Sequence, residues 1–549
     1  MSHATSVISN SRKSLLLGTS ALVCLALSTP VMADDFVITS SNGTTNGAGT
    51  TNGGTAANIA DNAINGSDTV SLGIALTTTG TNEGIRTSNV GNSITVSEAG
   101  SITTTGVFAD GIYNYGDDNT TSISGTVKAT GTRSAALYNI DGHRSSFTLD
   151  EGATIIGDIL SYTAADTTNS KLIFNLGSST SYAYSVSGAG EGKGAGQWEF
   201  SDLDGRTQGI TTTGTGCDST ITTITVCNLV TGVSTGNLEV QDELQFSMNT
   251  SMIGSLSLGS SNSTAPTEAM PSTQTLQSNT WANIYGDTSN RSASTTKLAF
   301  DGSNRGLTIG TPVAINDTLN LDLVFNASNA DLDIGSAKEQ RITARSYNLG
   351  AVLRDLAPTT VWAVDAFGFI GRNSYDGKRK VMNNQEATGS ETVTASYSGM
   401  EVLVGVDAQY SNPINDTLNF IGGLNASLSN EKIGAYSESK YFSWDARTMM
   451  QTSGGITAGL EYHTDALTIF ANLGLQRSSL QNGKTATYTN NGTAGSFTDS
   501  STGGTRRSVT VRFDYAGSES MTYSGAVEAF SSTGGVSGKS ASLSVNWSF

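Results

Sequence analysis

The chain has 549 residues, of which 63 are glycine and only six are proline, and it carries 47 acidic against 29 basic side chains. Its formal charge of −18 at neutral pH argues against a nucleic-acid partner, because phosphate binding needs a basic surface. A length above 500 residues predicts more than one domain.

The first 33 residues are predicted to be a secretory signal. Arg12 and Lys13 precede a short apolar run, and small or apolar residues lead up to a cleavage site between Ala33 and Asp34. The run is too short for a transmembrane helix, and the residue before Cys24 does not suit lipidation. Cleavage removes two basic and no acidic side chains, so the mature chain keeps 27 basic and 47 acidic ones, a formal charge of −20.

Residues 34–265 form a repetitive region without proline and with only seven basic side chains. The repeat places Gly80, Gly106, Gly131 and Gly157 at successive spacings of 26, 25 and 26 residues, with short β-prone pieces between them. This period predicts a right-handed, parallel β-helix-like fold over 70–230, in which each coil buries its apolar residues against the next. A disordered Ser/Thr/Gly stalk is the alternative.

Two cysteines remain after the signal, Cys217 and Cys227, with nine residues between them. In an oxidising exterior compartment the pair predicts a local disulfide, which contributes about 2–3 kcal/mol in the chain-entropy model. Metal binding is the competing interpretation, but none of the three histidines clusters near the pair. No metal or other cofactor is expected.

Pro266 and Pro271 mark a polar connector over 266–279, and residues 280–549 follow with four of the five tryptophans. In this last region five tight turns alternate with six longer polar connections, which predicts a twelve-stranded antiparallel barrel. The tight turns are expected at 315–317, 357–359, 412–416, 463–465 and 517–519. The longer connections are expected around 286–296, 327–339, 371–390, 428–439, 480–504 and 531–537.

Charged side chains within these strands are assigned to the barrel lumen, because they would be costly against lipid. Their expected role is to solvate a wet channel rather than to catalyse a reaction. The residues so assigned are Asp322, Asp365, Arg512, Asp514 and Glu528.

The last strand alternates without a break. Leu543, Val545, Trp547 and Phe549 form one apolar stripe, and the intervening serines and asparagine form a polar one. A strand with one apolar and one wet face suits a membrane β-barrel, and a soluble sandwich edge is the alternative for this segment alone.

The organisation resembles the monomeric autotransporters of Gram-negative bacteria. The resemblance rests on the signal, the N-terminal repeats, the segment 281–286 (Trp-Ala-Asn-Ile-Tyr-Gly), the twelve-strand count and the closing segment 545–549. It implies export by the Sec translocon, assembly into outer-membrane lipid by the barrel assembly machinery, which would read the last strand mainly through Trp547 and Phe549, and display of residues 34–265 as a passenger. It also implies a connector inside the pore, for which the prolines predict at most a short helix after Pro271.

Three functions compete for the passenger. The first is a non-enzymatic surface adhesin that binds a ligand on a host or neighbouring cell. The second is a secreted hydrolase, but a subtilase-like Asn249–Met252 lacks its partner motifs, and Gly232–Gly236 matches Gly-x-Ser-x-Gly without the strand-to-helix context. The third is a porin-like barrel with a periplasmic extension.

Overall fold

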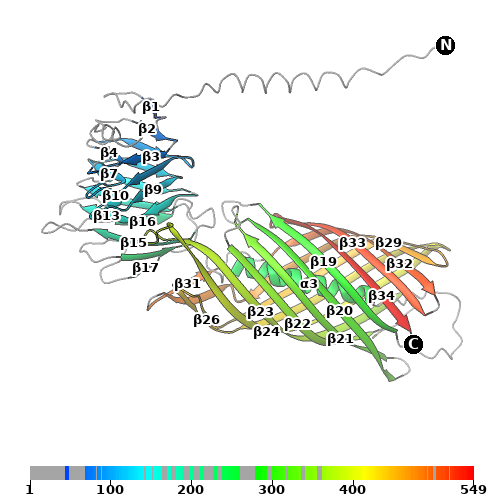
Figure 1. The fold of residues 1–549 in the computed structure, drawn as a ribbon. Coiled ribbons are helices and arrows are strands. Elements are labelled where there is room, and N and C mark those ends of the chain that lie inside the picture. Colours follow the sequence, from blue (N-terminus) through cyan, green and yellow to red (C-terminus); the bar gives the residue numbers. More distant parts are fainter. Residues whose placement is uncertain are drawn as a thin grey trace, which may run out of the picture. The chain divides into compact units, whose positions relative to one another are not determined.

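The computed structural model describes residues 44–47, 69–174, 181–188, 198–202, 211–213, 227–231, 238–259 and 279–548, with short gaps inside the longer ranges (Figure 1). The chain divides into two compact units, one centred on the segment up to Ile173 and one on the segment from Cys227 onward. The predicted cleavage site at Ala33 and Asp34, together with Cys217 and Phe549, lies outside the described residues.

The first unit is a parallel β-solenoid of about four turns over residues 70–186, as the repeat predicts. Its strands stack into three parallel sheets. Each of about four full turns adds one strand to each sheet, and the first sheet has further strands beyond these turns at both ends. The first sheet holds β1 (Thr44–Gly47), β2 (Thr69–Leu72), β5 (Ser93–Val96), β8 (Thr120–Ile123), β11 (Ser146–Leu149), β14 (Ser170–Phe174) and β16 (Trp198–Asp202). The second holds β3 (Ala75–Thr78), β6 (Ser101–Thr104), β9 (Thr126–Ala129) and β12 (Thr154–Ile156). The third holds β4 (Ile85–Thr87), β7 (Ile112–Tyr115), β10 (Ala135–Ile140), β13 (Asp158–Tyr162) and the end of β15 (Ser181–Gly188).

The solenoid core forms because equivalent side chains of successive turns stack in register. Leu72, Val96, Ile123 and Leu149 are paired strand to strand and are all at most 1% exposed. Each side chain covers the one before it, so no single turn buries its own apolar face.

Buried polar side chains in the solenoid also stack from turn to turn. The Thr87 hydroxyl donates to Asn114 Oδ1 at 2.5 Å, and Asn114 Nδ2 donates to Asn139 Oδ1 at 2.5 Å. The ladder gives these interior groups partners without water, as buried polar groups require.

The glycines of the sequence repeat mark corners at which successive turns touch through their backbones. A Cβ atom on Gly106 would lie 1.2 Å from the Gly80 carbonyl oxygen, and one on Gly131 would lie 1.7 Å from that of Gly106. Only glycine fits such an approach. The regular spacing of glycines in the sequence therefore follows from a steric constraint between successive turns.

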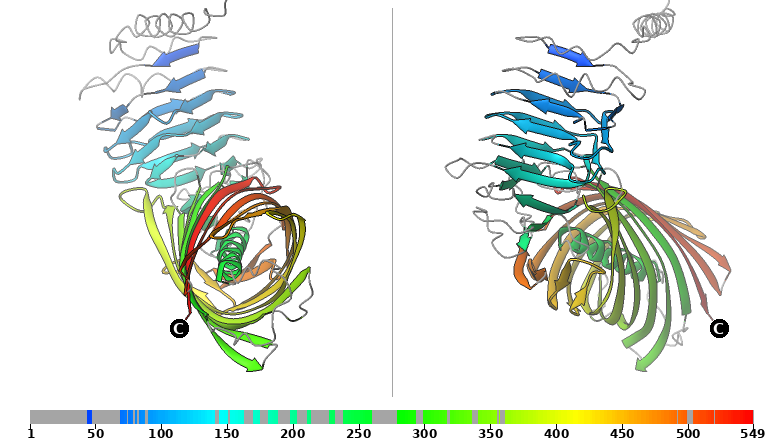
Figure 2. Two further views of the ribbon diagram at one scale, coloured as in Figure 1. Left: turned by 90° about the vertical axis from the view of Figure 1, so that its right-hand side faces the viewer. Right: turned by 60° about the vertical axis from the view of Figure 1, so that its left-hand side comes forward.

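The second unit contains a closed twelve-stranded antiparallel barrel (Figure 2). It runs through β19 (Asn279–Arg291), β20 (Phe300–Asn316), β21 (Leu319–Ile334), β22 (Gln340–Arg354), β23 (Trp362–Met382), β24 (Ser390–Asn415), β25 (Leu418–Ile433), β28 (Arg447–His463), β29 (Leu467–Asn482), β32 (Thr505–Ser518), β33 (Met521–Ser532) and β34 (Val536–Ser548). The first strand pairs with the last, from Asn279↔Ser548 to Arg291↔Val536, and this pairing closes the ring. The predicted strand number is confirmed.

Several polar stretches expected to be long loops are strand instead. Residues 327–334 continue β21, and residues 371–382 continue β23, opposite an equally extended β24. A crossing needs only about 9–11 residues, so strands of 21 and 26 residues project beyond a bilayer. Along 371–382 the inward side chains are buried, whereas the outward ones, such as Arg372, Asp376 and Lys378, are polar and meet water beyond the lipid, which explains why the sequence looks like loop.

Two of the remaining connections carry a small antiparallel sheet of their own. It consists of β26 (Tyr436–Ser437) and β27 (Phe442–Trp444) from the connection between β25 and β28, and of β30 (Thr485–Asn490) and β31 (Thr493–Thr498) from that between β29 and β32. A further short hairpin joins β17 (Thr211–Thr213) to β18 (Cys227–Thr231), which begins at one of the two predicted disulfide cysteines.

The outer face of the barrel is apolar. Large side chains alternate outward along each strand with more than a third of their surface exposed, and they include Leu323, Leu349, Leu473, Val509, Val527 and Leu543. Many of their inward neighbours are polar and buried, as Asn326 and Asn348 illustrate. This arrangement is the reverse of a soluble protein and is typical of a barrel in lipid.

Replacing Gly106 by alanine is expected to disrupt the solenoid, because the new Cβ would overlap the Gly80 carbonyl. Overpacking a site costs about 1–3 kcal/mol, and a backbone obstacle raises this cost. Gly73→Ala is the matched control, since its Cβ would meet only the Ser97 hydroxyl at 3.6 Å. We expect the full chain bearing Gly106→Ala to lose protease resistance of the solenoid at a lower urea concentration than Gly73→Ala. Equal midpoints would contradict the steric explanation.

Asp110 gives the solenoid a pH dependence. Its carboxylate is 5% exposed and accepts from the Ala135 amide at 2.6 Å, and burial raises its pKa to about 7. Because this pKa lies above the unfolded value near 4, the folded state holds the proton more tightly, and the contribution of Asp110 to stability falls as pH rises from about 4 to about 7. We expect Asp110→Asn to stabilise the solenoid at pH 8 and to leave it little changed at pH 4, measured by urea-dependent proteolysis. Asp150→Asn, on the partly exposed carboxylate that accepts from Ser122, serves as control. A benefit of Asp110→Asn that is equal at both pH values would refute the assignment.

Candidate functional site

A helix, α3 (Leu238–Gly259), lies inside the barrel, as the end-on view in Figure 2 shows. Its 22 residues give a length of about 33 Å, close to the thickness of a bilayer core. The helix therefore extends along the lumen and occupies it.

One side of α3 is apolar and packs on the barrel wall. Leu244 and Met248 contact a buried cluster that includes Phe300 and Leu332, and Met252 and Leu256 contact a second cluster around Trp281, Phe367 and Phe369. The four helix residues recur every fourth position, so they share one face. Their burial holds the helix against one side of the lumen.

The other side of α3 hydrogen-bonds to a buried carboxylate of β24. Glu401 Oε1 accepts from Asn249 Nδ2 at 2.7 Å and from Gln245 Nε2 at 3.3 Å. The wall residues Ser429 and Asn373 donate to the same carboxylate, at 2.8 and 3.2 Å. Hydrogen bonds to a charged group contribute about 1.5–3 kcal/mol each, so Glu401 is a principal anchor of the helix.

A second glutamate lies next to this anchor. Glu431 accepts from Asn373 at 3.0 Å and from the Tyr375 hydroxyl at 2.8 Å, so Asn373 bridges the two carboxylates. Both glutamates are at most 2% exposed. Two buried acidic side chains with neutral donors around them form the centre of the lumen network.

Asp287 of β19 is a further anchor. It accepts from the hydroxyls of Ser247 and Ser251, at 2.9 and 2.6 Å, which lie one helical turn apart on α3. Asn304 of the wall donates to it at 3.1 Å. Small polar residues of the helix thus match carboxylates of the wall at two levels.

At the C-terminal end of α3, Arg354 joins the helix to the wall. Its guanidinium donates to the Leu256 carbonyl at 3.4 Å, to Asp322 at 3.0 Å and to Asp365 at 2.8 Å. The indole of Trp281 also donates to Asp322, at 3.3 Å. A cation at the C-terminal carbonyls of a helix is favourable for its dipole, and the two aspartates offset its charge.

The structure brings together the charged residues that the sequence assigned to the lumen. Asp322 and Asp365 share Arg354. Arg512 and Asp514 pair with each other at 2.8 Å on one face of β32, and Glu528 pairs with Arg506 at 2.9 Å. Each predicted charge therefore has a partner of opposite sign, and Arg354 and Arg506 are the members that the sequence did not single out.

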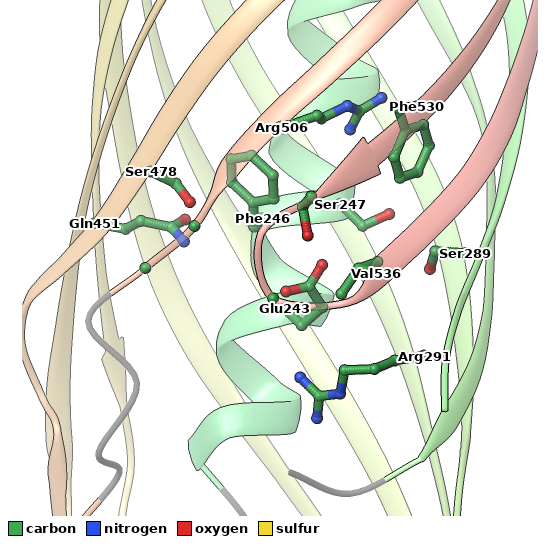
Figure 3. Close-up of a pocket in the computed structure, with 14 residues that line it drawn as sticks. Glu243, Phe246, Ser247, Ser289, Arg291, Gln451, Ser478, Arg506, Phe530 and Val536 are labelled. Atoms are coloured by element: carbon green, nitrogen blue, oxygen red, sulfur yellow. The ribbon is translucent and has the colours of Figure 1, made fainter. Parts of the chain in front are cut away.

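A small open pocket lies between α3 and strands of the wall (Figure 3). Glu243 and Phe246 of the helix face Arg291, Arg506 and Phe530 across it. The Arg506 guanidinium lies 3.5 Å from the centre of the Phe530 ring. The helix thus leaves polar space beside it on this side of the lumen.

The small sheet of the connections has an aromatic core. Tyr375, Tyr397, Tyr436 and Trp444 stack in series, with ring centres 4.9, 4.2 and 6.3 Å apart. Arg379 and Glu438 form an ion pair of 2.8 Å with neither side chain exposed. The connections that carry the small sheet are therefore ordered and have a packed core.

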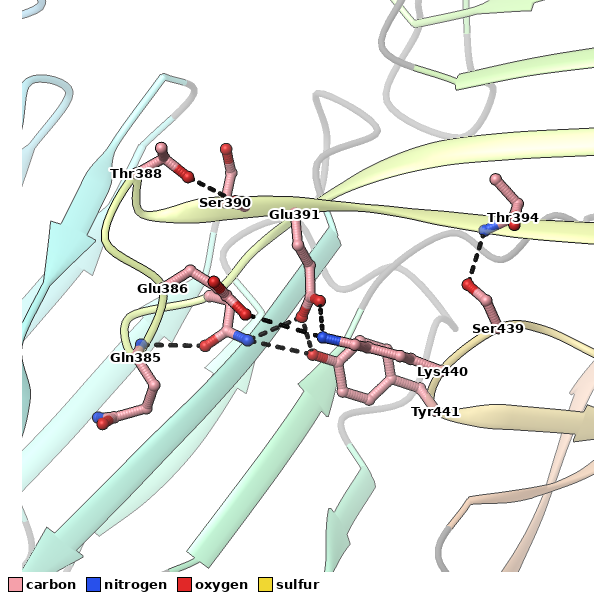
Figure 4. Close-up of polar contacts among 10 residues, drawn as sticks. Gln385, Glu386, Thr388, Ser390, Glu391, Thr394, Ser439, Lys440 and Tyr441 are labelled. Carbon is pink, nitrogen blue, oxygen red and sulfur yellow. Dashed lines mark hydrogen bonds and ion pairs between the residues drawn. The ribbon is translucent and has the colours of Figure 1, made fainter.

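Figure 4 shows a polar cluster beside this sheet, centred on Glu391. Lys440, the Tyr441 hydroxyl and Asn383 Nδ2 all donate to its carboxylate, Asn383 at 2.7 Å. The carboxylate raises the pKa of Lys440 above its ordinary value. The cluster ties the connection after β25 to the connection between β23 and β24.

The hydrolase signals of the sequence gain no support. Asn249 lies on α3 and binds Glu401, whereas Gly232–Gly236 lies outside the described residues. Within the described ranges, His, Cys, Asp and Glu form no group of three or more that could hold a metal ion. No helix in the same ranges has the length and apolar character needed to cross a membrane.

Comparison with known proteins assigns the barrel. The family model of the autotransporter beta-domain matches residues 280–528. These residues form an autotransporter β-domain. Such a domain is inserted in the outer membrane and displays the preceding part of the chain on the cell surface. That preceding part is the passenger.

Solved structures with similarity to the chain include three autotransporter barrels. They are the translocator domain of NalP from Neisseria meningitidis (15% identity, TM-score 0.43, 56% of this chain and 98% of that one), the beta domain of Bordetella BrkA (12%, 0.35, 50% and 100%) and the transport unit of AIDA-I from Escherichia coli (13%, 0.36, 55% and 98%). No curated protein matches the chain.

The lumenal segment of the β-domain differs from the expectation. The connector was expected at 266–279 with at most a short helix after Pro271, but the lumenal helix is 238–259, within the composition-defined passenger, and 266–278 lies outside the described residues. Composition misled because the helix is rich in Ser, Thr, Asn and Gln, like the passenger, and these residues suit a polar lumen.

A sequence signal for this helix existed. Leu244, Met248, Met252 and Leu256 recur at intervals of four, and no proline interrupts 238–259. Glu401 lies in an apolar stretch and carried the same signal as the predicted lumenal charges, whereas Glu431 fell in the segment 428–439 that was expected to be a loop. They are the functional residues that sequence reasoning missed.

Removing the Glu401 carboxylate is expected to loosen the plug of the β-domain. Glu401→Ala deprives Gln245 and Asn249 of their shared acceptor. We expect the full-length chain in planar lipid bilayers to show a several-fold higher single-channel conductance, approaching that of a variant lacking 238–259. Glu461→Ala is the control, because Glu461 is a wall glutamate that accepts from Asn419 at 3.2 Å. If the single-channel conductance of Glu401→Ala equals that of the wild type, Glu401 does not anchor the helix.

Proposed function

We propose that this chain is an autotransporter adhesin, whose β-domain supports the surface display of a rigid β-solenoid that binds a ligand on another cell. The observation that carries the proposal is α3 in the lumen, because it is the segment that leads from the passenger into the barrel. A stacked solenoid is a long scaffold of fixed shape, which suits the presentation of a binding surface.

The route to the surface follows from the same arrangement. The signal 1–33 directs the chain to the Sec translocon, and cleavage between Ala33 and Asp34 releases it into the periplasm. The barrel assembly machinery then recognises the last strand through Leu543, Val545, Trp547 and Phe549. Support comes from the place of β34, which pairs with both β19 and β33 and so completes the ring.

The domain boundaries then shift by one element. The passenger extends from residue 34 to the start of α3, the connector from 238 to 279 and the β-domain from 280 to 549. A disulfide between Cys217 and Cys227 closes a loop just before the connector. Such a loop is small enough to be compatible with passage to the surface.

The adhesin role is tested with cells that express the chain. Protease added to intact cells should remove the passenger, and deletion of 69–188 should abolish adherence or aggregation. Heat-modifiable electrophoretic mobility of the deletion variant is the control for an assembled β-domain. Adherence that survives the deletion would refute the adhesin, protection from protease would favour a periplasmic extension, and cleavage of a substrate panel by displayed passenger would favour the hydrolase.

A further inference from the structure

The third sheet of the solenoid differs from the other two in what it presents outward. Along β4, β7, β10 and β13, which occupy the left-hand side of the solenoid in Figure 1, the inward side chains are buried and the alternate ones are partly exposed. The outward set forms what we call the tyrosine face. It consists of Arg86, Tyr113, Tyr115, Tyr138, Ile140 and Leu160, with the exposed Asp158 at the start of β13 beside them.

Strand pairing arranges these side chains in two columns. Arg86, Tyr113, Tyr138 and Leu160 occupy successive register positions, and Tyr115 is opposite Ile140. Neighbouring strands lie about 4.8 Å apart, so the columns are continuous. Tyr113 packs between its neighbours, 5.1 Å from the Arg86 guanidinium and 5.4 Å from the Tyr138 ring.

The other two sheets present hydroxyls. The outward positions of β5, β8 and β11 are all serine or threonine, and those of β3, β6, β9 and β12 are serine and threonine with Ala75 and Lys128. β14 adds Lys171 and the half-buried Ile173 to the outward side of the first sheet, and among the strands of these two sheets whose side chains are described no aromatic side chain points outward. Large apolar area is thus concentrated on one of three otherwise similar surfaces, which is typical of an interaction site.

The chemistry of the face indicates its ligand. A tyrosine combines an apolar ring with a hydroxyl and has few rotors to immobilise on binding. Sugar rings present a matching surface, with one face of C–H groups and a rim of hydroxyls. The flat, regularly spaced columns fit a chain of such rings.

The charge of the passenger distinguishes between charged and uncharged ligands as candidate partners. Over 34–237 the passenger carries 19 acidic against seven basic side chains, so it repels an anionic ligand and a second copy of itself. Arg86 is the only cation on this face, and the exposed Asp158 of β13 carries the opposite charge. An uncharged ligand avoids this repulsion.

We propose that the tyrosine face binds an uncharged glycan, with Tyr113 and Tyr138 as its main contacts. This inference rests on the proposed adhesin function and names its ligand class and surface. Binding is independent of salt, because no net charge is transferred to the site.

The test uses intact cells that display the full chain on a printed array of uncharged glucose, galactose and mannose oligosaccharides, with sialylated glycans as the charged comparison. Wild type should be retained by at least one uncharged class, at low and at physiological salt alike. Tyr113→Leu with Tyr138→Leu keeps apolar bulk and should lower retention at least tenfold. Ser122→Ala with Thr148→Ala, on the first sheet, should leave it unchanged.

Protease resistance of each displayed variant shows that its solenoid is folded. Retention of Tyr138→Phe on the array shows whether the aromatic ring of residue 138 is sufficient for binding without its hydroxyl. Three outcomes would overturn the glycan proposal and leave the adhesin function intact. They are full retention of the double leucine variant, retention of cells only on sialylated glycans, and no retention on the array of wild-type cells that do adhere to other cells. If the double leucine variant instead loses cell-to-cell aggregation that no sugar inhibits, the partner is a protein surface. Failure of the adhesin itself would appear separately, as adherence that survives deletion of 69–188.

Discussion

The pairing of β19 with β34 is the interaction on which the rest of the β-domain depends. In a bilayer no water reaches the backbone, so each unpaired amide or carbonyl costs several kcal/mol, and a spanning sheet must close on itself. Here closure joins segments more than 200 residues apart, from Asn279↔Ser548 to Arg291↔Val536. Once the ring is closed, the apolar side chains that a soluble protein would bury face outward and the polar ones are enclosed.

Enclosure creates a second requirement, which α3 meets. A lumen lined with Asp287, Glu401 and Asp322 holds carboxylates away from bulk water, and buried charges need donors. The helix and the wall supply them level by level, through serine hydroxyls at Asp287, amides at Glu401 and Arg354 at Asp322. The polar character of the helix and the acidity of the wall are therefore two parts of one arrangement, and the plug and the pore stabilise each other.

The solenoid also encloses polar groups that need hydrogen-bond partners, although it does not lie in a membrane. Its turns satisfy one another, through the backbone pairing of parallel strands, the ladder from Thr87 to Asn139 and the close approach of Gly106 to Gly80. Because each turn copies the last, a side chain placed on one turn is repeated in space on the next. That repetition places Tyr113, Tyr115 and Tyr138 on one continuous face of the solenoid.

The sequence by itself determined the repeat period, the parallel solenoid and the number of barrel strands, because these depend on local alternation, on turn residues and on glycines whose need is steric. It also identified charges that the wall must turn inward, such as Asp322 and Glu528. Tertiary structure alone decided that 371–382 is strand, that 238–259 is the lumenal helix and that Gln245, Asn373 and Ser429 meet at Glu401. The physical reason is that a polar residue in a strand has the same local pattern whether it faces bulk water, an enclosed lumen or another segment, and only the closed ring distinguishes the three.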